Sequence, residues 1–313
     1  MTKKHVALVT GATGFCGGNL VTQLLASGYD VVGFDRESRP RADLTAYVGD
    51  ITDNARLRAI LGKVQPDVIF HLAALTNPRL EYQELHRVNA LGTLSLLDAV
   101  HQVCPKVLVL ITSSSAVYGL VEQADLPIRE TQPFRPLNAY AVSKIAQEMV
   151  AYTYYARYGL NVIRTRAFNL VGPGQPPSLV CSAFAKQIAE IEAGQAEPVL
   201  RVGNLTPQRD FVDVRDGARA YRLIAQHGQP GEVYNVCSEQ PVSIQTCLDE
   251  LLRLTRIPIR VEQDPDRMRP SDIPVSVGDG SLLRRQTGWC PAIPLEQSLA
   301  DLLDDWRRRI QGV

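Results

Sequence analysis

The stretch VTGATGFCGGNLVTQLL, residues 9–25, contains three glycines at the spacing G-x-x-G-x-x-G, namely Gly11, Gly14 and Gly17. β-Branched residues precede the first glycine and a helical pattern of apolar residues follows the last, so the glycines lie at a predicted strand-to-helix turn. Glycines there let the backbone approach a pyrophosphate, and the start of the helix offers free N–H groups and the positive end of its dipole. The stretch predicts a dinucleotide-binding turn. The alternative is a tight glycine turn that binds no ligand.

The segments around this turn alternate between strand and helix up to about residue 167. Short β-branched runs lie at residues 5–11, 30–35, 67–74 and 106–114. Helical patterns lie at residues 18–28, 54–64, 86–103 and 138–159, the last of them ended by Gly159. Alternating strands and helices form right-handed βαβ units, in which helices cover both faces of a parallel sheet. The sequence therefore predicts an α/β fold with a doubly wound parallel sheet of the Rossmann type.

The pattern of the chain changes after residue 167. Prolines become frequent, for example Pro173, Pro176 and Pro177, and longer loops separate the helical patterns. We therefore expect a dinucleotide-binding domain at residues 1–167 and a smaller α/β domain at residues 168–313. The smaller domain is expected to lie over the carboxyl edge of the sheet and to return some segments to it.

The composition indicates a globular protein with a small-molecule partner. Among 313 residues, 33 are basic and 33 are acidic, so the chain lacks the positive charge that binds nucleic acids or anionic membranes. No apolar run reaches the length of a membrane span, and the five histidines show no metal-ligand spacing. The six cysteines are scattered without a C-x-x-C pair, which indicates reduced thiols in a cytoplasmic protein. We expect no bound metal, no nucleic acid and no membrane partner.

An acidic residue ends the second predicted strand. Asp35 lies 24 positions after Gly11, where a carboxylate would bind the adenosine ribose hydroxyls of NAD. Arg36 follows directly and offers a cation to the 2′-phosphate of NADP, so both dinucleotides stay open. Asp50, in the segment VGDITD just before the helical pattern at residues 54–64, is either an adenine contact or the cap of a turn.

Tyr140 and Lys144 are four positions apart on the helix predicted at 138–159, and therefore lie on one face, one turn from each other. A free tyrosine phenol has a pKa near ~10, so proton exchange with a hydroxyl group at neutral pH needs a nearby cation that favours the phenolate. Lys144 can supply that charge and can also hold the nicotinamide ribose. The pair is thus a candidate catalytic pair.

Five segments, TGATGFCG, HLAA, SSSAVYG, YAVSK and NLVGPGQ, resemble in sequence and order the motifs of the extended short-chain dehydrogenase/reductase family that acts on nucleotide-activated sugars. The resemblance covers nearly the whole chain. It implies that Ser114 hydrogen-bonds the C4 oxygen of the sugar, that Tyr140 is the proton donor or acceptor, and that Lys144 tunes Tyr140. The cofactor is then NAD(H) or NADP(H). Its expected contacts are Gly11, Thr13, Gly14, Phe15, Gly17, Asp35, Arg36, Asp50, Ile51, Leu72, Ala73, Ala74, Tyr140 and Lys144.

Residues 266–299 are especially similar to the GDP-mannose 4,6-dehydratase and GDP-4-keto-6-deoxymannose reductase branch of this family. This similarity favours a GDP-sugar as the partner of residues 168–313. It implies that Arg209 and Arg269 clamp the nucleotide diphosphate, to which arginine presents a fixed fork of donors, and that Asp272 takes a ribose hydroxyl. The expected substrate contacts are Ser114, Ser115, Asn169, Arg209, Arg269 and Asp272.

Ala116 narrows the chemistry that the resemblance implies. A 4,6-dehydratase needs a carboxylic acid beside the catalytic serine or threonine, and in dehydratases of this family that acid occupies the position of Ala116. A methyl group cannot move protons, so the alanine argues against dehydration. Two activities remain, namely NAD(P)H-dependent reduction of a 4-keto-6-deoxy sugar to a GDP-6-deoxyhexose of the GDP-rhamnose type, and 4-epimerisation with retained NAD.

Two further expectations complete the analysis. A non-catalytic dinucleotide sensor is a third hypothesis, against which the intact Ser114, Tyr140 and Lys144 argue. The resemblance also implies a homodimer, in which residues 93–103 and the helix that carries Tyr140 pair into a four-helix interface.

Overall fold

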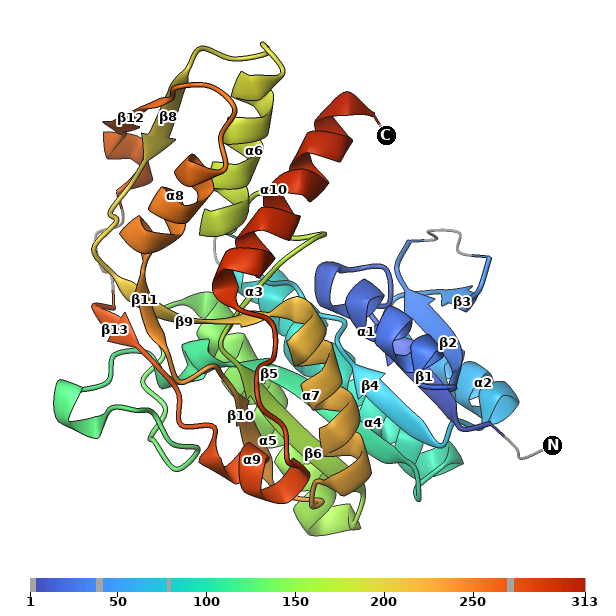
Figure 1. The fold of residues 1–313 in the computed structure, drawn as a ribbon. Coiled ribbons are helices and arrows are strands. Elements are labelled where there is room, and N and C mark those ends of the chain that lie inside the picture. Colours follow the sequence, from blue (N-terminus) through green and yellow to red (C-terminus); the bar gives the residue numbers. More distant parts are fainter. Residues whose placement is uncertain (1–3, 38–41, 78–79, 269–272, 313) are drawn as a thin grey trace.

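The computed structural model describes residues 4–37, 42–77, 80–268 and 273–312. At its centre is a seven-stranded parallel sheet with the strand order β10-β6-β5-β4-β1-β2-β3 (Figure 1). Its strands are β1 Val6–Thr10, β2 Asp30–Asp35, β3 Thr45–Val48, β4 Val68–His71, β5 Leu108–Ser114, β6 Asn161–Ala167 and β10 Val233–Val236. The predicted α/β fold with a doubly wound parallel sheet is confirmed.

Helices cover both faces of this sheet. The helices of one face are α1 Phe15–Ala26 and α7 Val214–His227, and those of the other are α2 Asn54–Val64, α4 Gly92–Val103 and α5 Ala139–Tyr158. Alternate residues of the strands supply the two cores: Phe70 packs with α1 and α7, and its neighbour Ile69 packs with α2, α4 and α5. Because both faces are covered, all four residues of β4 are buried.

The strand order reverses between β1 and β4. From β1 the chain moves outward to β2 and β3, and then crosses back to β4 on the other side of β1. In open parallel sheets the ligand crevice lies at the carboxyl ends of the strands on either side of such a reversal. The glycine turn follows β1 and residues 72–75 follow β4, so the fold places both at this crevice.

The helix predicted at residues 86–103 forms in three pieces. α3 (Tyr82–His86) leads into a π-helical turn, Arg87–Leu91, before α4 begins. The wider turn buries Asn89, whose amide bonds the N–H and C=O of Leu75 at 2.8 and 2.9 Å and donates to Ser143 Oγ at 2.9 Å. The interruption thus joins the loop after β4 to α5.

α5 has the bounds that the sequence predicted. Asn138 Oδ1 accepts a hydrogen bond from the backbone N–H of Ala141 at 2.9 Å, which caps the start of the helix. Gly159 ends it in the left-handed region, at φ 68°. These caps fix the register of α5 and so the direction of the side chains in its first two turns.

Part of the chain after β6 builds a second layer beyond the carboxyl ends of the strands, toward the top of Figure 1. Three helices there share a buried cluster: α6 Val180–Glu192, α8 Ile244–Arg253 and α10 Leu295–Gln311. Two small sheets accompany them, β7 Asn169–Val171 with β9 Gln208–Asp213, β11 Pro241–Ser243 and β13 Val275–Ser276, and β8 Val199–Val202 with β12 Arg260–Gln263. The chain also returns to the main sheet, since β10 pairs with β6 and α9 (Ser281–Thr287) packs against β10. The division into domains at residue 167 stays a prediction.

Within the described ranges, no helix is long and apolar enough to cross a membrane. In the same part of the chain, no group of three or more His, Cys, Asp or Glu side chains is placed to hold a metal ion.

Candidate active site

The glycine turn has the shape that a bound pyrophosphate requires. Gly11 has φ +72°, and a Cβ atom on it would lie 2.7 Å from the backbone nitrogen of Ala73. A Cβ atom on Gly17 would lie 1.9 Å from the carbonyl oxygen of Gly11, so α1 packs directly on the turn. The N-cap residue of α1 is Gly14, which has no side chain to cap the first-turn N–H groups. These groups are therefore available to an anion.

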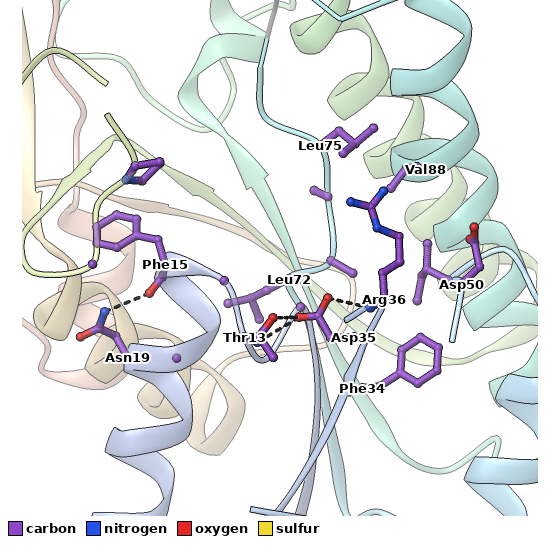
Figure 2. A pocket seen from close by; sticks show the side chains of 18 of the residues that line it. Thr13, Phe15, Asn19, Phe34, Asp35, Arg36, Asp50, Leu72, Leu75 and Val88 are labelled. Atoms are coloured by element: carbon purple, nitrogen blue, oxygen red, sulfur yellow. Dashed lines mark hydrogen bonds between the residues drawn. The ribbon is translucent and has the colours of Figure 1, made fainter. Parts of the chain in front are cut away.

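A cleft of about 900 Å³ runs along this edge of the sheet (Figure 2). Most of the predicted cofactor contacts line it, namely Gly11, Thr13, Gly14, Phe15, Asp35, Arg36, Asp50, Ile51, Leu72, Ala73 and Ala74. Gly17, Tyr140 and Lys144 lie outside this lining. The cleft also contains side chains that the sequence analysis did not single out, among them Arg87 and Arg309. The residues present fit a dinucleotide.

Asp35 and Arg36 hold different positions at the cleft. The Asp35 carboxylate accepts hydrogen bonds from Thr13 N at 2.9 Å and Thr13 Oγ1 at 2.7 Å, so it fixes the glycine turn to the end of β2. The Arg36 side chain extends into the cleft toward Leu75 and Val88 (Figure 2). Its guanidinium lies 3.7 Å from the exposed Glu37 carboxylate. An exposed contact of this length leaves the guanidinium able to pair with a phosphate.

Asp50 caps a turn and also lines the cleft, and its contact with adenine stays a prediction. It accepts hydrogen bonds from Thr52 N at 2.9 Å and Thr52 Oγ1 at 2.8 Å, which lower its pKa. Arg87 Nη1 donates to the same carboxylate at 3.1 Å, and Arg87 also makes two hydrogen bonds with Glu84 at 2.8 and 2.9 Å. The position of Arg87 follows from the π-helical turn, a feature with no signal in the sequence pattern.

Ser114, Tyr140 and Lys144 come together where β5 and α5 meet. Ser114 ends β5 and Tyr140 lies in the first turn of α5, and the Ser114 side chain is close enough to influence the pKa of Tyr140. Burial raises the pKa of Tyr140 to about 12, while Ser114 acts to lower this pKa and Cys16 acts to raise it. Tyr140 is therefore a phenol at neutral pH.

Lys144 is 2% exposed and donates from Nζ to the carbonyl oxygen of Thr112 at 2.7 Å. Burial lowers its pKa to about 8, whereas Glu148 and Cys16 act to raise it. Burial is the largest influence on the pKa of both Tyr140 and Lys144. The tuning of Tyr140 by Lys144 stays a prediction.

A buried ion pair lies one turn beyond Lys144. Arg166 of β6 makes three hydrogen bonds of 2.8–3.1 Å with the carboxylate of Glu148, and the two side chains are 4% and 0% exposed. Arg166 also donates to Tyr118 Oη at 3.0 Å, and Tyr118 follows the Ser114 segment. The arginine therefore links the element that carries Lys144 to the element that follows Ser114. Sequence reasoning missed this link because β6 and α5 meet only in the folded chain.

A second buried network lies under the loop after β4. His71 contacts Thr10 Oγ1 through Nδ1 at 2.7 Å and Thr93 Oγ1 through Nε2 at 2.8 Å. Since the Thr93 hydroxyl donates to Asn89 O, His71 Nε2 carries the proton toward Thr93. Burial, with Lys144 nearby, lowers the pKa of His71 to about 3, so the ring is neutral.

The structure describes four of the six predicted substrate residues, namely Ser114, Ser115, Asn169 and Arg209. Ser115 and Ala116 begin the turn after β5, and Ala116 N donates to Ser114 Oγ at 3.2 Å, so a methyl group lies beside the serine hydroxyl. Asn169 and Arg209 lie on the paired strands β7 and β9, where Asn169 Nδ2 donates to Asp210 O at 2.9 Å and Arg209 Nη1 donates to Ile273 O at 2.6 Å. Arg269 and Asp272 lie outside the described residues.

Comparisons with known proteins agree with this geometry. The sequence model of the GDP-mannose 4,6-dehydratase family matches residues 8–302. The chain is 38% identical to the GDP-6-deoxy-D-mannose reductase of Pseudomonas aeruginosa over 249 residues, which is 79% of this chain and 82% of that protein. The structure of RMD from Pseudomonas aeruginosa complexed with NADPH superposes with a TM-score of 0.87 at 34% identity, covering 98% of this chain and 100% of the other. The UDP-glucose 4-epimerase of Thermotoga maritima, solved with UDP-glucose, superposes with a TM-score of 0.86 at 25% identity, covering 97% and 99%.

Proposed function

Because the chain belongs to the GDP-mannose 4,6-dehydratase family of extended short-chain dehydrogenases/reductases, we propose that it reduces the C4 keto group of GDP-4-keto-6-deoxymannose with NADH or NADPH. The product is a GDP-6-deoxyhexose. The observation that carries the proposal is the bond from Lys144 Nζ to Thr112 O, which joins α5, the helix of Tyr140, to the end of β5. Ser114 lies at that end, with Ala116 beside it. This arrangement can orient a carbonyl oxygen and donate one proton, and it holds no acid for dehydration.

Each residue has a defined task in the proposed reaction. A bound nicotinamide cofactor supplies the hydride that reduces C4. The Ser114 hydroxyl orients the C4 oxygen, and Tyr140, which is a phenol at neutral pH, donates its proton to that oxygen. The glycine turn and the N-terminus of α1 hold the cofactor phosphates, and Lys144 positions the nicotinamide ribose beside Tyr140.

The two candidate activities begin with Tyr140 in opposite protonation states. Reduction needs an acid at the C4 oxygen, and burial keeps Tyr140 in the acid form. A 4-epimerase must first remove a proton from the C4 hydroxyl, for which the tyrosine has to be a phenolate. Epimerisation remains the second candidate, because the UDP-glucose 4-epimerase fold matches over nearly the whole chain.

The test is to mix the purified chain with GDP-4-keto-6-deoxymannose and either NADH or NADPH, and to follow the loss of reduced-nicotinamide absorbance. Oxidation of one cofactor per sugar consumed is expected. If neither cofactor is oxidised while GDP-hexoses or UDP-hexoses interconvert with protein-bound NAD, the chain is an epimerase. If the dinucleotide binds and no nucleotide sugar turns over, the sensor hypothesis replaces both.

We also propose a homodimer formed through α4 and α5. Leu91, directly before α4, and Leu94, in its first turn, are 53% and 40% exposed, and Met149 on the neighbouring α5 is 41% exposed. Large apolar side chains gathered on two adjacent helices favour a second copy of the same surface as their partner. A cytoplasmic location is a further proposal, which the six free thiols support.

A further inference from the structure

The C-terminal helix reaches the cofactor cleft. Arg309, in the last turns of α10, lines the same cleft as Gly14 and Phe15 at the start of α1. Pro173 and Gly174, in the loop after β7, line the cleft between these two elements. One end of the cleft is therefore closed by residues from three segments that are far apart in the sequence.

The cations of the cleft are unevenly placed. Its described lining contains three arginines, Arg36, Arg87 and Arg309. Arg87 is engaged by Glu84 and Asp50, and Arg36 acts on the same Glu84 carboxylate, so both lie at the Asp50 end. At the other end of the cleft, beside the first turn of α1, the described lining contains Arg309.

The Arg309 guanidinium is held in place. It pairs with Asp305 Oδ2 at 2.6 Å and lies 4.9 Å from the centre of the Trp306 ring. The same Asp305 oxygen accepts a hydrogen bond from Gly174 N at 2.9 Å. Trp306 Nε1 donates to Ser182 Oγ at 2.8 Å, so the helix is also anchored to α6. The arginine and the loop after β7 thus form one unit.

Gly174 permits the close approach of this unit to the glycine turn. It has φ +89°, and a Cβ atom on it would lie 3.5 Å from the Phe15 ring and 3.9 Å from Arg309 Nη2. The Phe15 ring and the Arg309 guanidinium therefore both border the space in front of Gly174. Asn19 of α1 contacts the other side of the loop, with Nδ2 at 3.5 Å from Pro173 O.

We propose that Arg309 binds the pyrophosphate of the dinucleotide, opposite the glycine turn, so that the C-terminal helix is part of the cofactor site. This proposal rests on the proposed function, because both require the cleft to bind a dinucleotide. A helix N-terminus offers only about half a positive charge, while the pyrophosphate carries two negative charges. A guanidinium already held by Asp305 and Trp306 adds directed donors without first having to be ordered.

The test compares two ligands by isothermal titration calorimetry. ADP-ribose contains the pyrophosphate, whereas adenosine 2′-monophosphate lacks it and carries the 2′-phosphate expected at Arg36. The variant Arg309→Gln keeps a polar side chain at this position and removes the charge. We expect its Kd for ADP-ribose to rise about tenfold, which corresponds to ~1.4 kcal/mol, and its Kd for adenosine 2′-monophosphate to stay unchanged.

The control variants lie on the same helix, at Arg309 itself and at its neighbour Arg308. Arg308→Gln removes the neighbouring charge, which is 59% exposed and 3.9 Å from Asp305, and is expected to change neither Kd. Arg309→Lys restores the charge and is expected to recover part of the ADP-ribose affinity. An equal Kd for ADP-ribose in Arg309→Gln and the wild type, or equal losses for both ligands, overturns the proposal. A wild-type chain that binds neither ligand overturns the proposed function, and this inference with it.

Discussion

Tyr140 and Lys144 show how burial sets the protonation of a catalytic pair. Burial disfavours the charged form of each, so it raises the pKa of Tyr140 to about 12 and lowers that of Lys144 to about 8. The group that titrates first as the pH rises is therefore the lysine. Glu148 opposes the effect of burial on Lys144 and keeps the ammonium charged at neutral pH.

The pH dependence of reduction follows from these two values. We expect kcat/KM to fall as the pH rises through about 8, because Lys144 loses its proton there while Tyr140 still holds the proton that it must donate. Initial rates of NAD(P)H oxidation between pH 6 and pH ~10.5 measure this fall in kcat/KM. If kcat/KM fell only near pH ~10, where an ordinary lysine or tyrosine titrates, the assignment of the fall to Lys144 would be wrong.

Substitution of Tyr140 tests the proton donor directly. Tyr140→Phe removes the hydroxyl group and keeps the ring, so kcat is expected to fall ~100-fold or more, the usual contribution of an acid–base group. The Kd for ADP-ribose should stay at the wild-type value, because Tyr140 lies outside the lining of the cleft. Normal turnover of this variant would show that another group protonates the C4 oxygen.

At the scale of elements, α5 links the catalytic side chains to the core. Its buried face carries Ser143, Lys144, Gln147 and Glu148 in two consecutive turns. Ser143 bonds Asn89 in the π-helical turn, and Glu148 pairs with Arg166 of β6. The position of Lys144 is therefore determined by contacts on both of its sides.

Removal of one partner of the buried ion pair should destabilise the fold strongly. Arg166→Met leaves the Glu148 carboxylate buried and unpaired, which is expected to lower the free energy of unfolding by about 3–5 kcal/mol. Urea unfolding measures this loss. Addition of Glu148→Gln to the same chain should recover part of it, because the uncompensated charge is then gone.

The matched control is an exposed ion pair. Lys4 and Asp30 are 3.5 Å apart with side chains 64% and 59% exposed, so Lys4→Met is expected to change the free energy of unfolding by less than ~1 kcal/mol. If Arg166→Met were as mild as Lys4→Met, the buried pair would not hold α5 against the sheet.

At the scale of the whole molecule, the proposed dimer explains the exposed apolar side chains of α4 and α5. The double variant Leu94→Glu and Met149→Glu places two carboxylates in that interface, and we expect it to sediment as a single chain where the wild type sediments as two. Leu254→Glu is the control, since Leu254 is similarly exposed, at 38%, but ends α8. A monomeric wild type would refute the dimer.

The sequence by itself determined the parallel sheet, the glycine turn and the helix that carries Tyr140 and Lys144. The sheet follows from the alternation of apolar runs and amphipathic segments, and the turn and the helix follow from spacing within single segments. Such patterns record local physical requirements: Gly11 and Gly17 admit no side chain, and Asn138 and Gly159 set the ends of α5. Each requirement is met within a few residues of the chain.

Only the tertiary structure decided which distant residues complete the site. Arg87 enters the cleft because a π-helical turn shifts it toward Asp50, and Arg309 enters because α10 packs beside the loop that contains Gly174. Arg166 reaches Glu148 across the boundary between sheet and helix. The protonation of Tyr140 and Lys144 also belongs here, because a pKa depends on how far folding removes a group from water, and no spacing along the chain encodes that distance.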